Sequence, residues 1–113
     1  MSETSEITRP LIEALNETGG MALRMNSGKV KVARGFVQLH EEGTADILFF
    51  HKLSATGIPF TSNICWIETK HPRGHTHKDR AEKQAEFRAK VEALGHRYIR
   101  VESVRQGLDE ALQ

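Results

Sequence analysis

The stretch "ICWIETK", residues 64–70, is an apolar run that ends with an acid and a base. A short apolar run of this kind is typical of a buried strand. A second run, "DILFF" at residues 46–50, begins with an acid, and turn-forming residues "SATGIPFTSN" at 54–63 separate the two runs. If the runs pair as an antiparallel hairpin, the start of the first lies beside the end of the second. The sequence therefore predicts a buried hairpin with charged residues at one edge of a sheet.

The segments before this hairpin predict one helix and further strands. Near the N-terminus apolar residues recur at helical spacing, at Ile7, Leu11, Ile12 and Leu15. Pro10 lacks a backbone N–H and crowds the preceding turn, so the regular helix either starts near Thr8 or bends at Pro10. The turn signal "NSG" at 26–28 precedes an alternating, strand-like pattern with apolar positions Val30, Val32, Val37 and Leu39.

The last third of the chain predicts a helix, a strand and a second helix. The first of these helices carries an apolar stripe and is followed by a glycine that favours termination, at Phe87, Val91, Leu94 and Gly95. Thr76 or Asp79 is its expected N-cap. "YIRV" at 98–101 predicts a short strand, and Ser103 with Gln106 forms a capping box for the last helix. The order predicts a mixed α/β domain in which helices cover a central sheet.

Composition sets the class of protein. The chain has 113 residues, of which 38% are hydrophobic and 27% charged, and this is typical of one folded domain. Its apolar runs are far shorter than the about 20 residues that a membrane helix needs. No secretory signal is visible at the N-terminus, so we expect a cytoplasmic protein. Cys65 is the single cysteine, which excludes an intrachain disulfide and a multi-cysteine zinc site and favours a buried, inert thiol.

Three charged residues define a candidate site at the edge of the predicted hairpin. Residues two apart on a strand share a face, roughly 6.5 Å apart, so Glu68 and Lys70 project together while Thr69 points away. Antiparallel pairing brings Asp46 beside Glu68. Two crowded carboxylates repel unless a cation compensates, and Mg²⁺ is held by one or two carboxylates with water and substrate phosphate. Asp46, Glu68 and the Thr69 carbonyl are therefore candidate metal ligands.

The roles of the neighbouring residues follow from this arrangement. Lys70 would orient the attacking water or neutralise charge on a phosphate in the transition state. Gln84 shares the apolar side of its predicted helix near the N-terminal end, where it needs a polar partner. Because that helix starts just after the strand that ends at Lys70, Gln84 could hold the lysine or the water.

Each of these residues also has an ordinary structural interpretation. Most Glu-x-Lys pairs at strand ends are surface polar residues or weak ion pairs. An aspartate before a strand usually serves turn chemistry, and a single glutamine is usually satisfied by the backbone. The order of these residues along the chain nevertheless favours a functional site. Gly-x-x-Asp precedes a strand and a loop, the next strand ends in Glu-x-Lys, and the following helix carries a glutamine. The residues are Gly43, Asp46, Glu68, Lys70 and Gln84.

With this set the chain resembles the virus-type replication-repair nuclease (VRR-NUC) domain, a branch of the PD-(D/E)XK nucleases. The resemblance runs from about Glu6 to Leu112 and rests on "SEITRPLIEAL", "LRMNSGKV", "GTADILFF", "WIETK", "KQAEF" and "ALGHRYIRV". It implies a single stand-alone nuclease domain over residues 1–113. The implied fold is restriction-endonuclease-like, a central mixed sheet flanked by helices in the order α-β-β-β-α-β-α.

The resemblance also implies roles for individual residues. Asp46, Glu68, Lys70 and Gln84 match the family's catalytic positions, although its usual Pro-Asp is Ala45-Asp46 here, which leaves the chemistry intact because proline is no ligand. Glu6 matches the acid of the first helix and joins the expected metal ligands. The implied cofactor is Mg²⁺ or Mn²⁺, and the implied assembly is a homodimer that cuts branched DNA such as Holliday junctions.

Basic and histidine-containing segments provide the expected DNA contacts. Arg24, Asn26 and Gly28 match the family's Arg-x-Asn-x-Gly segment, and basic residues follow it at Lys29, Lys31 and Arg34. "HPRGHTHK" at 71–78 lies between the catalytic strand and the helix with Gln84, so it borders the substrate. Phosphate contacts by such residues are independent of sequence. Its expected DNA-binding residues are Arg73, His75, His77 and Lys78. A solvated loop without function remains an alternative.

Three functions remain open on the sequence. The first is a Mg²⁺-dependent, structure-selective DNA endonuclease. The second is a non-catalytic nucleic-acid-binding module that keeps the nuclease fold, against which the acids and the lysine argue. The third is a small metal-binding protein organised by three histidines, His71, His75 and His77. No cysteine lies near them, and their spacing does not match a common zinc motif.

Overall fold

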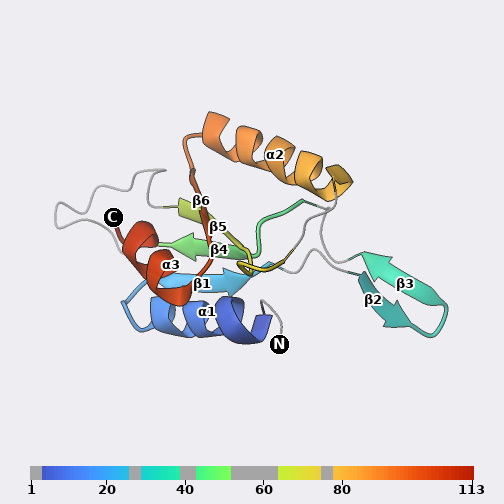
Figure 1. Ribbon diagram of the computed structural model, residues 1–113, viewed down its shortest axis with the longest axis horizontal. Coiled ribbons are helices and arrows are strands. Elements are labelled where there is room, and N and C mark those ends of the chain that lie inside the picture. The colour runs from blue at the N-terminus through green and yellow to red at the C-terminus, as the bar shows by residue number, and fades with distance from the viewer. Residues whose placement is uncertain (1–3, 26–28, 39–42, 52–63, 75–77) are drawn as a thin grey trace.

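A four-stranded mixed sheet forms the centre of the molecule in the computed structural model (Figure 1), which describes residues 4–25, 29–38, 43–51, 64–74 and 78–113. Its strand order is β1-β4-β5-β6. The strands are β1 (Met21–Arg24), β4 (Ile47–Phe50), β5 (Ile64–Thr69) and β6 (Arg97–Val101). The β5–β6 pair is parallel and the other two pairs are antiparallel. The coarse prediction of a mixed α/β domain is confirmed.

The predicted hairpin between "DILFF" and "ICWIETK" is confirmed. Ile47 lies opposite Ile67, and Phe50 lies opposite Ile64. Since Asp46 precedes Ile47 and Glu68 follows Ile67, both acids lie at the same end of the paired strands. The alternation along β5 is also as expected, because Cys65, Ile67 and Thr69 are buried on one face.

A separate two-stranded hairpin extends away from the sheet (Figure 1). It consists of β2 (Lys29–Val32) and β3 (Gly35–Gln38). Strands were predicted here, but these two do not join the central sheet in the described part of the chain. The order of elements therefore has five strands between the first and second α-helices, where the predicted order had three.

Helices cover both faces of the sheet. A short π-helix, η1 (Thr4–Thr8), leads into α1 (Arg9–Asn16), which packs with α3 (Val104–Ala111) on one face. The helix α2 (Lys78–Ala93) lies on the other face, where it contacts β6. Pro10 occupies the first turn of α1, directly after the π-helical turn η1. The regular helix thus starts next to Thr8, as one of the two alternatives predicted.

The main core fills the space between the sheet and the helices α1 and α3. Its largest fully buried side chains are Phe49, Leu11, Leu15, Ile47, Ile67 and Val101. Gly107 allows α3 to approach α1 closely, because a Cβ added there would lie 2.5 Å from Leu11 Cδ2. The N-terminal periodicity predicted this face correctly, since Ile7, Leu11 and Leu15 are all buried.

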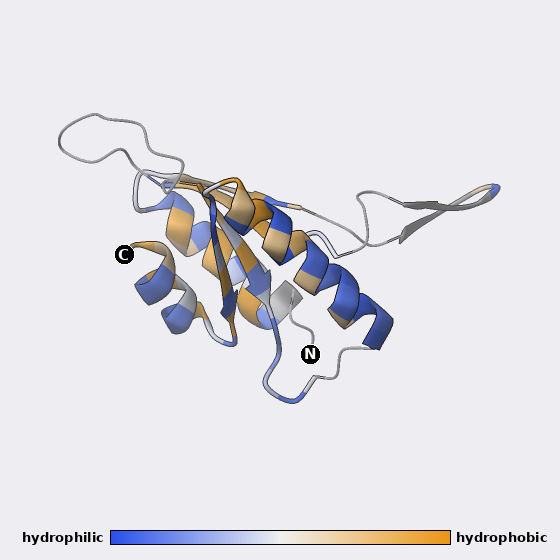
Figure 2. Cartoon of the chain, turned by 90° about the horizontal axis from the view of Figure 1, so that it is seen from above, coloured by the Kyte–Doolittle hydropathy of each residue, from blue (hydrophilic) through white to orange (hydrophobic). Residues whose placement is uncertain are grey.

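The face under α2 is thinner and more polar. Trp66 meets Phe87 edge to face, with ring centroids 5.0 Å apart, and Val91 is buried. Leu94, predicted on the same stripe, is 68% exposed because α2 ends at Ala93. Figure 2 shows α2 as largely hydrophilic, most clearly at its N-terminal turns. The helix therefore covers the sheet through a few aromatic contacts and leaves room for polar groups.

The helix ends follow the predicted signals in part. Gly95 has φ +86° and follows α2, as expected of a terminating glycine. Asp79 is not the N-cap of α2, because the helix already includes Lys78, and Thr76 lies outside the described residues. The Ser103 hydroxyl caps α3 by accepting from the Gln106 N–H at 3.0 Å, while Gln106 Oε1 accepts from the Glu102 N–H rather than that of Ser103.

In the described residues no helix is both long and apolar enough to cross a membrane.

The buried thiol of Cys65 predicts an alkaline limit to stability. Burial, partly offset by the charge of Arg97, raises the pKa of Cys65 from 9.0 to about 11. Between these values the unfolded chain loses the thiol proton and the folded chain keeps it, so the free energy of unfolding falls as pH rises, by up to about 1.4 kcal/mol per pH unit. Urea unfolding of the wild type and of Cys65→Ala from pH 8 to 11 checks this. Parallel pH dependences in the two proteins would contradict it.

Candidate functional site

Asp46 is held at the sheet edge by the end of β5. Its Oδ2 accepts hydrogen bonds from the Thr69 N–H at 2.9 Å and from the Thr69 hydroxyl at 3.0 Å. The Thr69 and Thr8 hydroxyl oxygens lie 2.8 Å apart. Because the single proton of the Thr69 hydroxyl goes to Asp46, Thr8 is the donor in this pair. A continuous chain of hydrogen bonds therefore connects the first helical segment to the Asp46 carboxylate.

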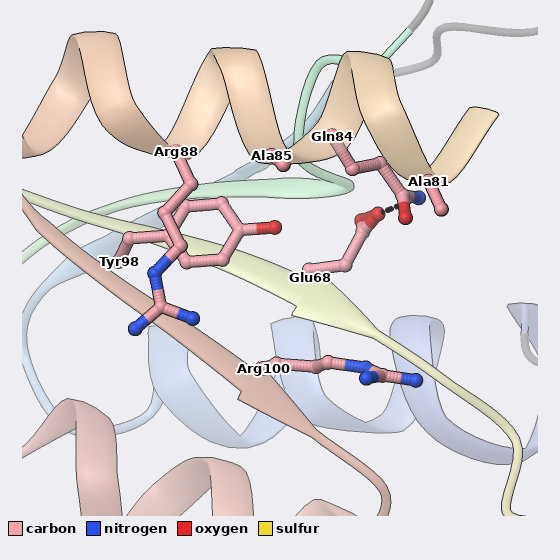
Figure 3. A pocket seen from close by; sticks show the side chains of 7 residues that line it. All are labelled: Glu68, Ala81, Gln84, Ala85, Arg88, Tyr98 and Arg100. Carbon is pink, nitrogen blue, oxygen red and sulfur yellow. Dashed lines mark hydrogen bonds between the residues drawn. The ribbon is translucent and has the colours of Figure 1, made fainter. Parts of the chain in front are cut away.

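Glu68 projects from the opposite face of β5, toward α2. The residue is only 4% exposed, and its Oε1 accepts a hydrogen bond from the Gln84 side-chain amide (Figure 3). Gln84 was predicted to hold Lys70 or a water, and the structure gives its amide a carboxylate partner instead. The physical reason is that Gln84 comes from the first half of α2, which lies over the strand position of Glu68.

Lys70 follows the last residue of β5. Its backbone N–H donates to the Val101 carbonyl at 2.9 Å, which extends the pairing between β5 and β6 by one residue. Thr69 points toward Thr8, on the face opposite Glu68, as the alternation predicted. The projection of Lys70 on the side of Glu68 stays a prediction.

Glu6 has a partner outside this group. Its Oε2 lies 2.7 Å from His71 Nε2, and the Arg73 N–H donates to His71 Nδ1 at 3.2 Å. Because Nδ1 accepts, Nε2 carries the proton and donates it to Glu6. The contact places Glu6 at the start of the loop that follows Lys70.

A pocket of about 210 Å³ opens between α2 and the sheet beside Glu68. The sheet contributes Glu68, Tyr98 and Arg100, and α2 contributes Ala81, Gln84, Ala85 and Arg88. Figure 3 shows the Tyr98 and Glu68 side chains projecting from the sheet toward the helix, with Arg88 beside the Tyr98 ring. The Arg88 guanidinium carbon lies 5.1 Å from the centroid of that ring. Two arginines and a phenol thus line the pocket together with Glu68.

The electrostatics of Tyr98 indicate that both acids act on the same region. Burial, and next the negative charge of Glu68, raises the pKa of Tyr98 well above its ordinary value, and Asp46 acts in the same direction. Arg88 opposes this shift. The Tyr98 hydroxyl therefore stays protonated at all ordinary pH values and can serve as a hydrogen-bond donor.

The donor set suits a hard cation. Carboxylate and carbonyl oxygens are the ligands that Mg²⁺ prefers, and one or two carboxylates suffice because water and substrate complete its shell. Asp46, Glu68 and the Thr69 carbonyl provide such oxygens at one end of β4 and β5. Across the described ranges, no group of three or more His, Cys, Asp or Glu side chains is arranged to hold a metal ion.

The predicted DNA-binding residues are only partly described. Arg24, Arg73 and Lys78 are exposed, at the end of β1, in the turn after β5 and at the start of α2. Lys29 lies on β2, which is separate from the sheet. Asn26, His75 and His77 lie outside the described residues, so the histidine-loop predictions stay predictions.

Sequence reasoning missed four residues near the site: Thr8, Arg88, Tyr98 and Arg100. Two signals pointed to them. Arg88 follows Gln84 by one helical turn, so the two share a side of α2. Tyr98 and Arg100 alternate on β6, and the parallel register places them beside Trp66 and Glu68. That register could not be read from the sequence alone.

Comparisons with protein-family models, with curated proteins and with solved structures found no match to this chain.

Proposed function

We propose that this protein is a Mg²⁺-dependent DNA endonuclease that hydrolyses phosphodiester bonds, built on a restriction-endonuclease-like PD-(D/E)XK core. The observation that carries the proposal is the meeting of Asp46 and the Glu68-Thr69-Lys70 segment at one end of the β4–β5 pair. Two acids and a lysine at a sheet edge are the groups that metal-assisted phosphodiester hydrolysis needs.

The proposed metal ligands lie at this edge of the sheet. Asp46, Glu68 and the Thr69 carbonyl are the proposed ligands for Mg²⁺ or Mn²⁺, and Glu6 is a further candidate. When bound, such a metal polarises a phosphoryl oxygen and lowers the pKa of a bound water.

The surrounding residues position these groups. Thr69 orients Asp46 through two hydrogen bonds, so the carboxylate keeps one oxygen facing the backbone. Gln84 orients Glu68 through a hydrogen bond from its side-chain amide. Lys70 would place an ammonium on the Glu68 side of the strand, where it would neutralise charge on a phosphate or orient the attacking water.

The partners belong to the same proposal. The substrate would be branched DNA such as a Holliday junction, in the cytoplasm, and the active form a homodimer. A two-fold dimer presents two identical sites, which matches the symmetry of a four-way junction and gives paired cuts.

A cleavage assay tests the proposal. Four-way, flapped, single-stranded and linear duplex DNA are incubated with the wild type in Mg²⁺, Mn²⁺ or EDTA, and products are resolved on denaturing gels. We expect metal-dependent cuts, strongest on the branched substrates, and no cuts with Glu68→Gln. Binding without cleavage by the wild type in either metal would support the alternative, a non-catalytic binding module, and reject the nuclease.

A further inference from the structure

The pocket beside Glu68 is lined by two arginines and one acid. Arg88 and Arg100 line it together with Glu68, and Glu92, outside the lining, pairs with Arg88. Glu68 already accepts a hydrogen bond from Gln84, which also lines the pocket. A cavity of this composition favours an anionic group.

The two arginines are differently placed. Arg88 is anchored, because its Nε lies 3.1 Å from Glu92 Oε1 and its guanidinium carbon lies 5.1 Å from the Tyr98 ring centroid. Arg100 is exposed and makes no ion pair with any described residue. It lies opposite Glu68 in the parallel β5–β6 register. Its five N–H donors are therefore available at the mouth of the pocket, beside the candidate catalytic acid.

Tyr98 adds a neutral donor between Arg88 and Glu68. In Figure 3 its hydroxyl points along the pocket toward Glu68. Arginine guanidinium and tyrosine hydroxyl groups are suited to phosphate oxygens, which accept several hydrogen bonds at once.

We propose that this pocket binds a phosphate group of the nucleic-acid backbone, neighbouring the phosphate that is cut, with Arg100, Arg88 and Tyr98 as its donors. The proposal rests on the proposed function in taking a nucleic-acid strand as the ligand. The position of Arg100 beside Glu68 implies that the strand crosses the sheet edge along β6 and the first half of α2. Arg100 and Arg88 are positioning residues in this arrangement, since they hold the strand rather than the reacting phosphate.

The test measures binding in EDTA, where cleavage does not interfere. A fluorescent single-stranded oligonucleotide and a four-way junction are titrated with the wild type, Arg100→Gln, Arg88→Gln and the control Arg105→Gln. The side chain of Arg105 is 92% exposed on α3, on the other face of the sheet. We expect Arg100→Gln to weaken binding about tenfold and to lower the slope of log K against log salt by about 1. Arg105→Gln should change neither.

Three outcomes separate this proposal from the nuclease proposal. If both pocket variants bind DNA like Arg105→Gln, the pocket assignment is wrong even where the wild type cuts DNA. If the pocket variants lose affinity but the wild type cuts nothing in Mg²⁺ or Mn²⁺, the pocket assignment holds and the nuclease proposal fails. If the wild type binds no DNA, both fail. Arg100→Lys should recover the salt slope, because it keeps the charge.

A competition arm identifies the source of the phosphate. Thymidine monophosphate and an unlabelled oligonucleotide are compared at equal phosphate concentration as competitors of the labelled strand. If only the oligonucleotide displaces the labelled strand, the pocket binds a phosphate of the nucleic-acid backbone. Equal displacement by the mononucleotide would assign the pocket to a free nucleotide and overturn the proposal. Thermal melts of each variant confirm that the fold is kept.

Discussion

Replacing Asp46 with Asn is expected to abolish metal-dependent DNA cleavage, with a fall in rate of at least about a hundredfold. The substitution removes the negative charge that would hold the cation in the proposed site but keeps an oxygen that can accept from the Thr69 N–H. The hydrogen bonds to Thr69 are therefore largely preserved, and the loss would report on chemistry rather than folding. Initial rates on a labelled four-way junction at several Mg²⁺ concentrations measure it.

A matched control and a second variant sharpen this result. Asp79→Asn removes the same charge from an exposed position in the first turn of α2 and should leave the rate within about twofold. Lys70→Ala should also lose cleavage, while the metal dependence of any residual rate stays that of the wild type. Equal rates for Asp46→Asn and Asp79→Asn would remove Asp46 from the proposed mechanism.

Phe49→Ala is expected to cost about 3–5 kcal/mol of unfolding free energy. Phe49 is among the largest fully buried side chains and sits on the β4 face that meets α1. Its loss leaves a cavity in the main core, which the sheet backbone cannot refill. Urea denaturation followed by circular dichroism measures the change.

The neighbouring aromatic residue provides the control. Phe50 is 36% exposed on the other face of the same strand, so Phe50→Ala should cost clearly less than Phe49→Ala. Similar losses in the two variants would show that the faces of β4 are assigned wrongly. Because Phe49→Ala can leave little folded protein, Phe49→Leu serves as a milder variant with a smaller loss in the same direction.

The sequence predicted the β4–β5 hairpin but not the whole four-stranded sheet. β4 and β5 are indicated by short apolar runs with charges at the ends that pair. β1 was not predicted, because Met21 and Leu23 are exposed in this edge strand and only Ala22 is buried. The position of the β2–β3 hairpin outside the sheet depends on tertiary contacts, which a local sequence pattern does not predict.

The candidate site was likewise predicted only in part. The proximity of Asp46 to the end of β5 follows from strand pairing, and the sequence predicted it. Other partners did not follow, since Gln84 reaches Glu68 only once α2 packs on the sheet, and Thr8 reaches Thr69 only once the N-terminal helical segment does. The pocket with Tyr98 and Arg100 was missed because it requires the parallel β5–β6 register, which joins residues separated by a helix.

The strict alternation along β5 has a consequence for how errors in folding would appear. A shift of this strand by one residue would turn Glu68 into the apolar core and Thr69 toward α2. The same slip would expose Ile67 and break the hydrogen bonds of Asp46. The buried core and the candidate site therefore depend on the same strand register, so a molecule with a shifted β5 would lose both together. Under the proposed function, damage to the fold would lower the number of active molecules, while the specific activity of those that remain folded would stay constant.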